Sequence, residues 1–210
     1  MISLPLLFFA PLLQGHSIED WRGRPHLTPG VEATWSKEER AIKQKEWNKD
    51  RDSHWRMEGD EIVNDGGGVF LTTIQDYGDF SLSLEYKTVA GADSGIYLRG
   101  CPQVQIWDWT EAGGKWNLGA DKGSGGLWNN QTHPRFPSQR MDKPFGEWNT
   151  LRIVMVGSYV SVWMNGVQVV HRAVLENYFD RSQPVPARGP VQLQTHGGEI
   201  RWRNISIAEF

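Results

Sequence analysis

The sequence predicts an all-β protein, an antiparallel β-sandwich with one short helical insertion. Short runs of strand-forming residues recur from Ile62 to the C-terminus, and Gly, Asn or Asp separates many of them. No helical pattern separates successive strands in the second half, which argues against parallel βαβ winding. A chain of 210 residues is long enough for one such sandwich. We therefore expect a single domain over residues 1–210.

The helical insertion is expected between Ser36 and Asp52. Ser36 followed by Glu39 forms a capping box, in which each side chain caps a backbone N–H of the other residue. The residues that follow are mostly Lys, Glu, Gln and Ala, which favour helix. The few apolar residues form only a weak stripe, so we favour a solvated helix over a partner-binding one.

The strands are expected after this helix. The pair Asn165-Gly166 predicts a hairpin, because both residues tolerate the positive φ values of a type I′ turn. The expected strands cover residues 62–64, 69–73, 80–88, 95–99, 104–107, 150–156, 159–164, 167–172, 191–195 and 199–207.

The N-terminal residues 4–13 are apolar and allow two interpretations. The run is similar to the hydrophobic part of a signal peptide, but no positively charged segment precedes it. We favour a first strand, with or without a trimmed leader before it, and the alternative is a signal peptide. No run reaches the ~18 consecutive apolar residues that a membrane span needs.

Composition narrows the choice of ligand. A formal charge of −3 gives no basic surface for nucleic acid or for an anionic membrane. The chain has 11 Trp and 23 Gly, as expected of a β fold with many turns and with aromatic surfaces that stack on flat ligands. The single cysteine, Cys101, has no partner for an internal disulfide or a zinc pair. A neutral ligand such as a sugar fits best.

Several strands carry polar side chains where an ordinary core strand carries hydrocarbon. The clearest is Gln103-Val-Gln-Ile-Trp-Asp108, which combines amides, an indole and a carboxylate. Side chains alternate along a strand, so the polar ones share a face. We expect these faces to line a single cleft that carries Glu85, Tyr97, Arg99, Gln103, Gln105, Trp107, Gln194 and His196.

Asp108 does not fit strict alternation, which would point it into the core, where an ionised carboxylate is costly. The strand can bulge or end before Asp108 and turn it into the cleft, as often happens near active sites. The alternatives are burial against a cation, or a turn-capping role before the Gly-rich segment. We favour the first interpretation.

The glycine-rich segment 113–128 is too long for a simple hairpin. Lys122 and Trp128 on such a loop can close over a ligand, one as a cation and the other as a stacking surface. No P-loop or dinucleotide-binding fingerprint accompanies the glycines. We favour a lid that faces a sugar, the alternative being a surface loop without ligand contacts.

Taken in order, these segments resemble the 3-keto-disaccharide hydrolase family. The resemblance rests on Ala92-Asp-Ser-Gly-Ile-Tyr-Leu-Arg99, on Gly146-Glu-Trp-Asn149 and on His196-Gly197. It extends through residues 9–21, 65–73, 77–80, 125–128, 165–166 and 203–205, while residues 22–55 have no clear counterpart. Gln103 and Thr195 stand where the family commonly carries acids.

The resemblance implies a jelly roll of the concanavalin or laminin-G type, a periplasmic or extracellular bacterial location, and an oligosaccharide or glycoside substrate. The implied activity is cleavage of a 3-keto-glycoside. The ketone at C3 acidifies the C2 proton, a base removes it, and the group on C1 leaves by β-elimination. The oligomeric state stays open.

This chemistry needs a base, an electrophile for the enolate oxygen and groups that hold the sugar. We expect Asp108, Glu85 and His196 to supply the base or acid, and Arg99 and Lys122 to stabilise the enolate. Amides and rings hold the substrate: Tyr97, Gln103, Gln105, Trp107, Trp128 and Gln194. The sequence does not demand a particular cofactor, and a divalent metal can replace the cationic electrophile. No close spacing of metal ligands occurs in the sequence.

Two other functions stay open at this point. A non-catalytic carbohydrate-binding domain needs only aromatic rings and amides, and the missing acids at Gln103 and Thr195 favour it. A conventional retaining glucanase needs two carboxyls about 5 Å apart, commonly presented as E-x-D-x-x-E. That motif does not occur in the chain, so this function is the weakest of the three.

Overall fold

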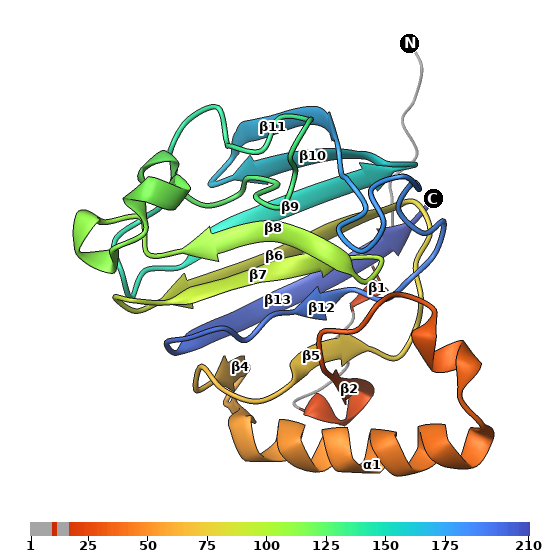
Figure 1. Cartoon of the computed structure of the whole chain (residues 1–210). Coiled ribbons are helices and arrows are strands. Elements are labelled where there is room, and N and C mark those ends of the chain that lie inside the picture. The colour runs from red at the N-terminus through yellow and green to blue at the C-terminus, as the bar shows by residue number, and fades with distance from the viewer. Residues whose placement is uncertain (1–9, 12–16) are drawn as a thin grey trace.

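The computed structural model describes residues 10–11 and 17–210, which form two antiparallel sheets and one α-helix (Figure 1). The predicted β-sandwich with a helical insertion is confirmed. Of the N-terminal apolar run, only β1 (Ala10–Pro11) is described, and it pairs with Ser206 and Ile207. The rest of that run, and with it most of the predicted first strand, lies outside the described residues.

The larger sheet has eight strands, seven of them in the order β11-β10-β9-β6-β13-β4-β3, while β1 pairs with β13. The bounds are β11 (Val167–Val174), β10 (Tyr159–Met164), β9 (Asn149–Val156), β6 (Phe80–Thr88), β13 (Ile200–Glu209), β4 (Glu61–Asn64) and β3 (Trp55–Glu58).

The smaller sheet has five strands in the order β2-β5-β12-β7-β8. Their bounds are β2 (Trp21–Arg24), β5 (Phe70–Thr73), β12 (Gln192–Leu193), β7 (Asp93–Leu98) and β8 (Cys101–Trp107). The side chains of both sheets that face inward form one hydrophobic core. The smaller sheet therefore has a second face available for a site.

Alternation along β6 places its side chains as predicted. Phe80, Leu82, Leu84 and Tyr86 are buried in the core, so Glu85 lies on the outer face of the larger sheet. The turn between β10 and β11 is also as predicted, because Asn165 and Gly166 have φ values of 50° and 82°. These left-handed conformations suit Asn and Gly.

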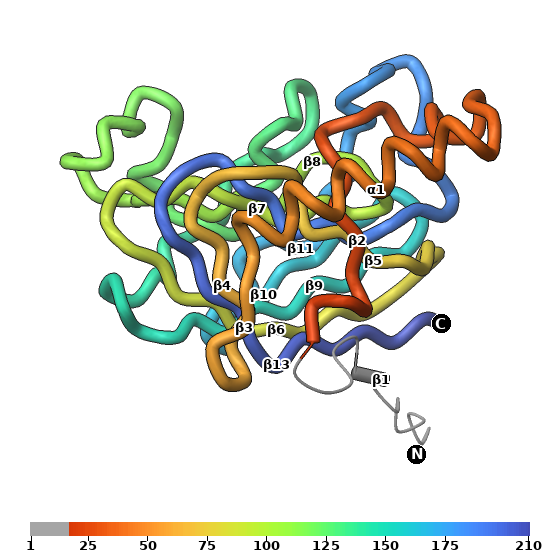
Figure 2. The backbone as a smooth tube through the Cα atoms, turned by 90° about the horizontal axis from the view of Figure 1, so that it is seen from below, coloured from red at the N-terminus to blue at the C-terminus, as the bar shows by residue number. Residues whose placement is uncertain are grey.

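The helix α1 (Lys37–His54) begins after Ser36, whose hydroxyl oxygen accepts a hydrogen bond of 3.0 Å from the Glu39 backbone N–H. It lies along β2, as the view from below shows (Figure 2). Gln44 donates a hydrogen bond of 2.9 Å to the Gly23 carbonyl. The remaining helices are single 3₁₀ turns: η1 (Ile18–Asp20), η2 (Val31–Thr34), η3 (Glu111–Gly113), η4 (Trp116–Leu118) and η5 (Ala120–Lys122).

Two strands were not expected from the sequence, β2 and β3. Each is an edge strand with charged residues at alternate positions, and β2 also contains a glycine. Their pairing with β5 and β4 decides their conformation, which local propensity does not reveal. Within the described residues, no helix is long and apolar enough to cross a membrane.

Candidate functional site

A pocket of about 460 Å³ lies against the outer face of the smaller sheet, and we call it the sheet pocket. Strands β7 and β8, the segment after β12 and the loop after β8 supply most of its lining. The lining residues are His26, Phe70, Asp93, Tyr97, Pro102, Gln103, Gln105, Trp107, Lys115, Leu118, Trp128, Asn129, Tyr178, Gln194, Thr195 and His196. Seven residues predicted from the sequence therefore meet here: Tyr97, Gln103, Gln105, Trp107, Trp128, Gln194 and His196.

Asp93 joins the polar side chains of this pocket. One carboxylate oxygen accepts a hydrogen bond of 2.7 Å from the Gln105 amide. The other lies 2.9 Å from Nδ1 of His196 and forms an ion pair with Lys115. The Asp93 side chain is only 11 % exposed, whereas the His196 side chain is 63 % exposed. The carboxylate is thus buried beneath a histidine that reaches into the open pocket.

The backbone brings Asp93 and His196 together. Asp93 begins β7, and its backbone N–H donates a hydrogen bond of 2.8 Å to the carbonyl of Gly197. A carboxylate that accepts from Nδ1 fixes the imidazole tautomer and leaves Nε2 as a proton acceptor. The pair therefore has the arrangement of a general base with its orienting acid.

The loop after β8 supplies the cation of the site. Lys115 precedes η4 and reaches back to Asp93. Sequence reasoning missed both residues. Asp93 stands inside the motif Asp93-Ser-Gly-Ile that carried the family resemblance, so the motif was the signal for it. Nothing in the sequence around Lys115 distinguishes it from Lys122 on the same loop.

Three glutamine amides border the buried carboxylate. The Gln103 amide N–H donates to Oε1 of Gln105, and the Gln105 amide N–H donates to the Asp93 carboxylate. The buried Oε1 of Gln194 has no hydrogen-bond partner among the described residues. A side chain at Gly95 would lie 3.1 Å from that oxygen and 3.2 Å from Cδ of Gln103, so glycine makes room for both amides. An unpaired acceptor of this kind suits a ligand hydroxyl.

Aromatic rings form the walls of the pocket. Trp107 and Trp128 meet edge to face with centroids 6.1 Å apart, and their indole N–H groups donate to the Gly123 and Leu118 carbonyls. Burial raises the pKa of the Tyr97 hydroxyl, which keeps it a neutral donor. Burial, followed by the charge of Arg24, lowers the pKa of His26 and favours its neutral form. Such walls suit the apolar faces of a sugar.

Glu85 and Arg99 do not reach this pocket, which differs from the single-cleft expectation. Glu85 belongs to the larger sheet, where it accepts a hydrogen bond of 2.6 Å from Arg203, because alternation identifies a face but not a sheet. Arg99 has a φ of 54°, which ends β7 and turns its side chain away. Its buried guanidinium donates to the carbonyls of Gly78 and Gly157 and pairs with Asp79 at 2.6 Å.

Asp108 and Lys122 also lie outside the lining. Strand β8 ends at Trp107, and the Asp108 carboxylate accepts from Gly91 N–H at 2.7 Å, Thr110 N–H at 2.8 Å and the Thr110 hydroxyl at 2.6 Å. This is the turn-capping alternative. Burial would raise the pKa of Asp108, but these hydrogen bonds hold it below its usual value. Lys122 pairs with Asp121 at 2.6 Å and borders a neighbouring pocket.

A divalent metal would find few ligands here. Among residues 10–11 and 17–210, no group of three or more His, Cys, Asp or Glu side chains is placed to hold a metal ion. The sheet pocket offers Asp93 and His196, with amide oxygens beside them. The positive group that the structure itself places there is Lys115.

A β-sandwich with an amide-rich, aromatic-walled pocket on one sheet is typical of carbohydrate-active proteins. The family model described as "3-keto-alpha-glucoside-1,2-lyase-like domain" matches residues 9–208 of this chain. The chain therefore belongs to that family, as the sequence motifs predicted. A comparison with curated proteins finds no similar sequence.

Two solved structures from Parabacteroides distasonis, both provisionally described as glycosyl hydrolases, are similar to this fold. The first has a TM-score of 0.59 and 20 % identity, and the alignment covers 74 % of this chain and 83 % of that one. The second has a TM-score of 0.58 and 23 % identity over 75 % of this chain and 91 % of that one. At this identity they support the fold alone.

Proposed function

We propose that this protein cleaves 3-keto-glycosides by abstracting the C2 proton and eliminating the C1 substituent. The family membership supports a lyase-like activity on sugars. The observation that carries the proposal is the Asp93–His196 pair in the sheet pocket, with Lys115 on the same carboxylate oxygen. It combines a base, an orienting acid and a cation within one pocket.

His196 acts as the base in this proposal. With Nδ1 held by Asp93, its Nε2 accepts the C2 proton of the bound sugar. The electron pair of the C2–H bond moves into the enolate at C2 and C3. It then forms the C1–C2 double bond as the C1 substituent departs with the electrons of its bond. Asp93 stabilises the imidazolium that results.

Lys115 supplies the electrophile. A positively charged group beside the C3 oxygen stabilises the negative charge that develops there in the enolate. This role replaces the one expected of Arg99 and Lys122, both of which are held elsewhere. Gln103, Gln105 and Gln194 hold the sugar hydroxyls, and the rings of Trp107 and Trp128 pack on its faces.

The decisive experiment compares a 3-keto-glucoside with its unoxidised parent. We expect the wild-type protein to cleave only the keto form and to exchange the C2 proton with solvent deuterium, followed by NMR. His196→Ala should lower both rates by roughly 10² or more, and Asp93→Asn should also lower them. His171→Ala, an exposed histidine on β11, is the matched control and should retain both rates.

Other outcomes would replace the proposal. Cleavage of the parent alone would indicate a conventional glycosidase, although the described lining of the sheet pocket contains one carboxylate, Asp93, rather than a pair. Binding of both sugars without turnover would indicate a carbohydrate-binding domain. The amides of Gln103, Gln105 and Gln194, and the absence of acids at positions 103 and 195, favour a carbohydrate-binding domain over a conventional glycosidase.

A further inference from the structure

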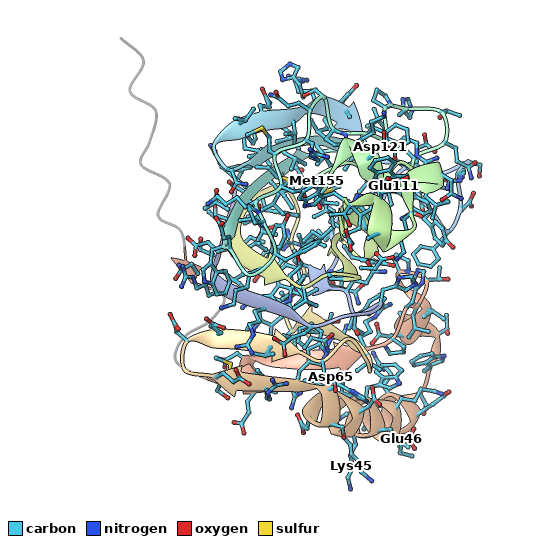
Figure 3. All side chains as sticks on the ribbon, turned by 90° about the vertical axis from the view of Figure 1, so that its left-hand side faces the viewer. Lys45, Glu46, Asp65, Glu111, Asp121 and Met155 are labelled. Carbon is cyan, nitrogen blue, oxygen red and sulfur yellow. The ribbon has the colours of Figure 1, made fainter. Side chains whose placement is uncertain are left out.

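A second pocket of about 550 Å³ adjoins the sheet pocket, and we call it the loop pocket. Leu118 and Trp128 line both pockets, so the two spaces meet at these side chains. The rest of the lining comes from η4, η5 and the segment around Arg135. Asp121, one of its lining residues, is labelled in Figure 3 within the loop region beside Glu111.

The loop pocket gathers apolar surface that the fold leaves in solvent. Trp116, Leu118 and Phe136 are 45 %, 43 % and 40 % exposed, and all three line this pocket. Exposed apolar side chains that gather around one hollow, rather than lying singly on the surface, indicate a candidate binding surface. Two of the three side chains are aromatic, so the surface suits a flat ring.

Arg135 provides an unneutralised charge in the same place. Its guanidinium carbon lies 4.9 Å from the ring centroid of Trp128 and 5.0 Å from that of Phe136. Within the described part of the chain it makes no ion pair, and its buried Nε has no hydrogen-bond partner. Lys122, in contrast, is paired with Asp121. A guanidinium held between rings is well placed to bind a carboxylate in two-point fashion.

We propose that the loop pocket is the leaving-group subsite and that it selects a planar aromatic aglycone bearing a carboxylate. The inference rests on the proposed function for its chemistry. The sugar occupies the sheet pocket, and its C1 substituent crosses Trp128 into the loop pocket. On elimination the aglycone departs as a phenolate with the electron pair of the C1–O bond. Trp116 and Phe136 contact its ring, and Arg135 binds its carboxylate.

Two isosteric aglycones test the charge selection. The substrates are the 4-carboxyphenyl and 4-carbamoylphenyl 3-keto-glucosides, with a 3-keto-disaccharide as the third. We expect kcat/KM to be about tenfold higher for the carboxyl compound than for the amide, since a charged hydrogen-bonded pair replaces a neutral contact. Arg135→Gln should bring this ratio close to one.

A charge-matched control separates the local effect from a general one. Lys45→Gln removes the same charge on α1, where Lys45 points away from the protein at the opposite end of the view from Asp121 (Figure 3). It should leave the tenfold ratio unchanged. Trp116→Ala, at an exposed position, should lower kcat/KM for both aromatic substrates more than for the disaccharide.

The outcomes distinguish this inference from the proposed function. Equal kcat/KM for the two aromatic compounds, lowered alike by Arg135→Gln, overturns the subsite while leaving the elimination chemistry intact. A preference for the disaccharide over both also overturns it. NMR shifts of the Trp116 indole measure the binding of the free aglycones. We expect 4-hydroxybenzoate to bind and 4-hydroxybenzamide not to bind. If this binding occurs without turnover of any keto-glycoside, the loop pocket stands as a site for an aromatic carboxylate, while the proposed function fails and with it the leaving-group role.

Discussion

At the scale of single residues, the carboxylate of Asp93 is the most constrained group of the candidate site. A buried carboxylate needs donors to offset its lost hydration. Here an amide, an ammonium and an imidazole supply them. These three donors hold the carboxylate in position before any ligand arrives, and two of them remain if one is removed. The pocket is thereby organised in advance, as electrostatic catalysis requires.

Replacing Asp108 tests whether its carboxylate stabilises a turn rather than taking part in the reaction. Asp108→Ala removes the acceptor for three hydrogen bonds, one from the Gly91 N–H and two from Thr110. We expect the free energy of unfolding to fall by roughly 1–3 kcal/mol, measured by urea denaturation. The control is Asp60→Ala, an exposed turn residue that should change it by less than about 0.5 kcal/mol. An equal loss in both variants would contradict the capping role.

The site residues that could be predicted from the sequence are mostly those whose positions follow strand alternation. Gln103, Gln105 and Trp107 follow strand alternation, so the sequence indicated their shared face. Arg99 does not, because its left-handed backbone ends the strand. Lys115 reaches the site from a loop whose path depends on 3₁₀ turns that carry no strand or helix period. Side chains whose positions depend on an irregular backbone conformation cannot be predicted from sequence periodicity.

At the scale of elements, α1 is joined to β2 by polar contacts more than by an apolar stripe. Asn48 accepts a hydrogen bond of 3.0 Å from the Gly23 N–H, and Gln44 donates to the Gly23 carbonyl. A Cβ on residue 23 would lie 2.3 Å from the Trp47 carbonyl oxygen, so only glycine allows this approach. The weak stripe seen in the sequence therefore fits a helix that satisfies the backbone of an edge strand.

The cap of α1 gives a prediction at this scale. Ser36→Ala removes the acceptor for the Glu39 N–H, and we expect it to cost about 1 kcal/mol of local stability. Hydrogen exchange of the amides in the first turn of α1 should accelerate about fivefold. Ser53→Ala, which changes an exposed serine near the other end, should leave those amides unaffected. Ser36→Asp retains an acceptor and should exchange like the wild type.

At the scale of the whole molecule, Glu176 links stability to pH. Burial would raise its pKa, but N–H groups of Gln131, Thr132 and His133 and the Thr132 hydroxyl lower it to about 2. Because the folded pKa lies below the ordinary value, this contribution to stability is complete above about pH 4.5. It is lost as the pH falls from there towards 2.

We therefore expect Glu176→Gln to destabilise the protein at pH 7 by roughly 1–3 kcal/mol. The difference from the wild type should shrink as the pH falls through the window between 4.5 and 2. Urea denaturation at pH 7, 5 and 3 measures it. Glu147→Gln, an exposed residue, serves as the control. A difference that stays constant over this range would show that the charge of Glu176 is not responsible.

The class of the fold could be predicted because alternation, turn residues and one capping box are local signals. The order of strands could not. β6 lies between β9 and β13, and its pairing with β13 joins residues more than a hundred positions apart in the sequence. Only packing of the two inner faces decides such pairings. For the same reason the sequence could not show that Glu85 lies on the larger sheet while His196 follows a strand of the smaller one.

The segment that contains α1 also has a consequence for the behaviour of the protein at high concentration. It begins with β2, the edge of one sheet, and leads into β3, the edge of the other. Uncovered edge strands are templates on which neighbouring molecules add strands and aggregate. Side chains of α1 already occupy the free backbone groups of Gly23 on β2. The segment that contains α1, which has no clear counterpart in the family motifs, thus protects the β2 edge of the smaller sheet from intermolecular strand pairing.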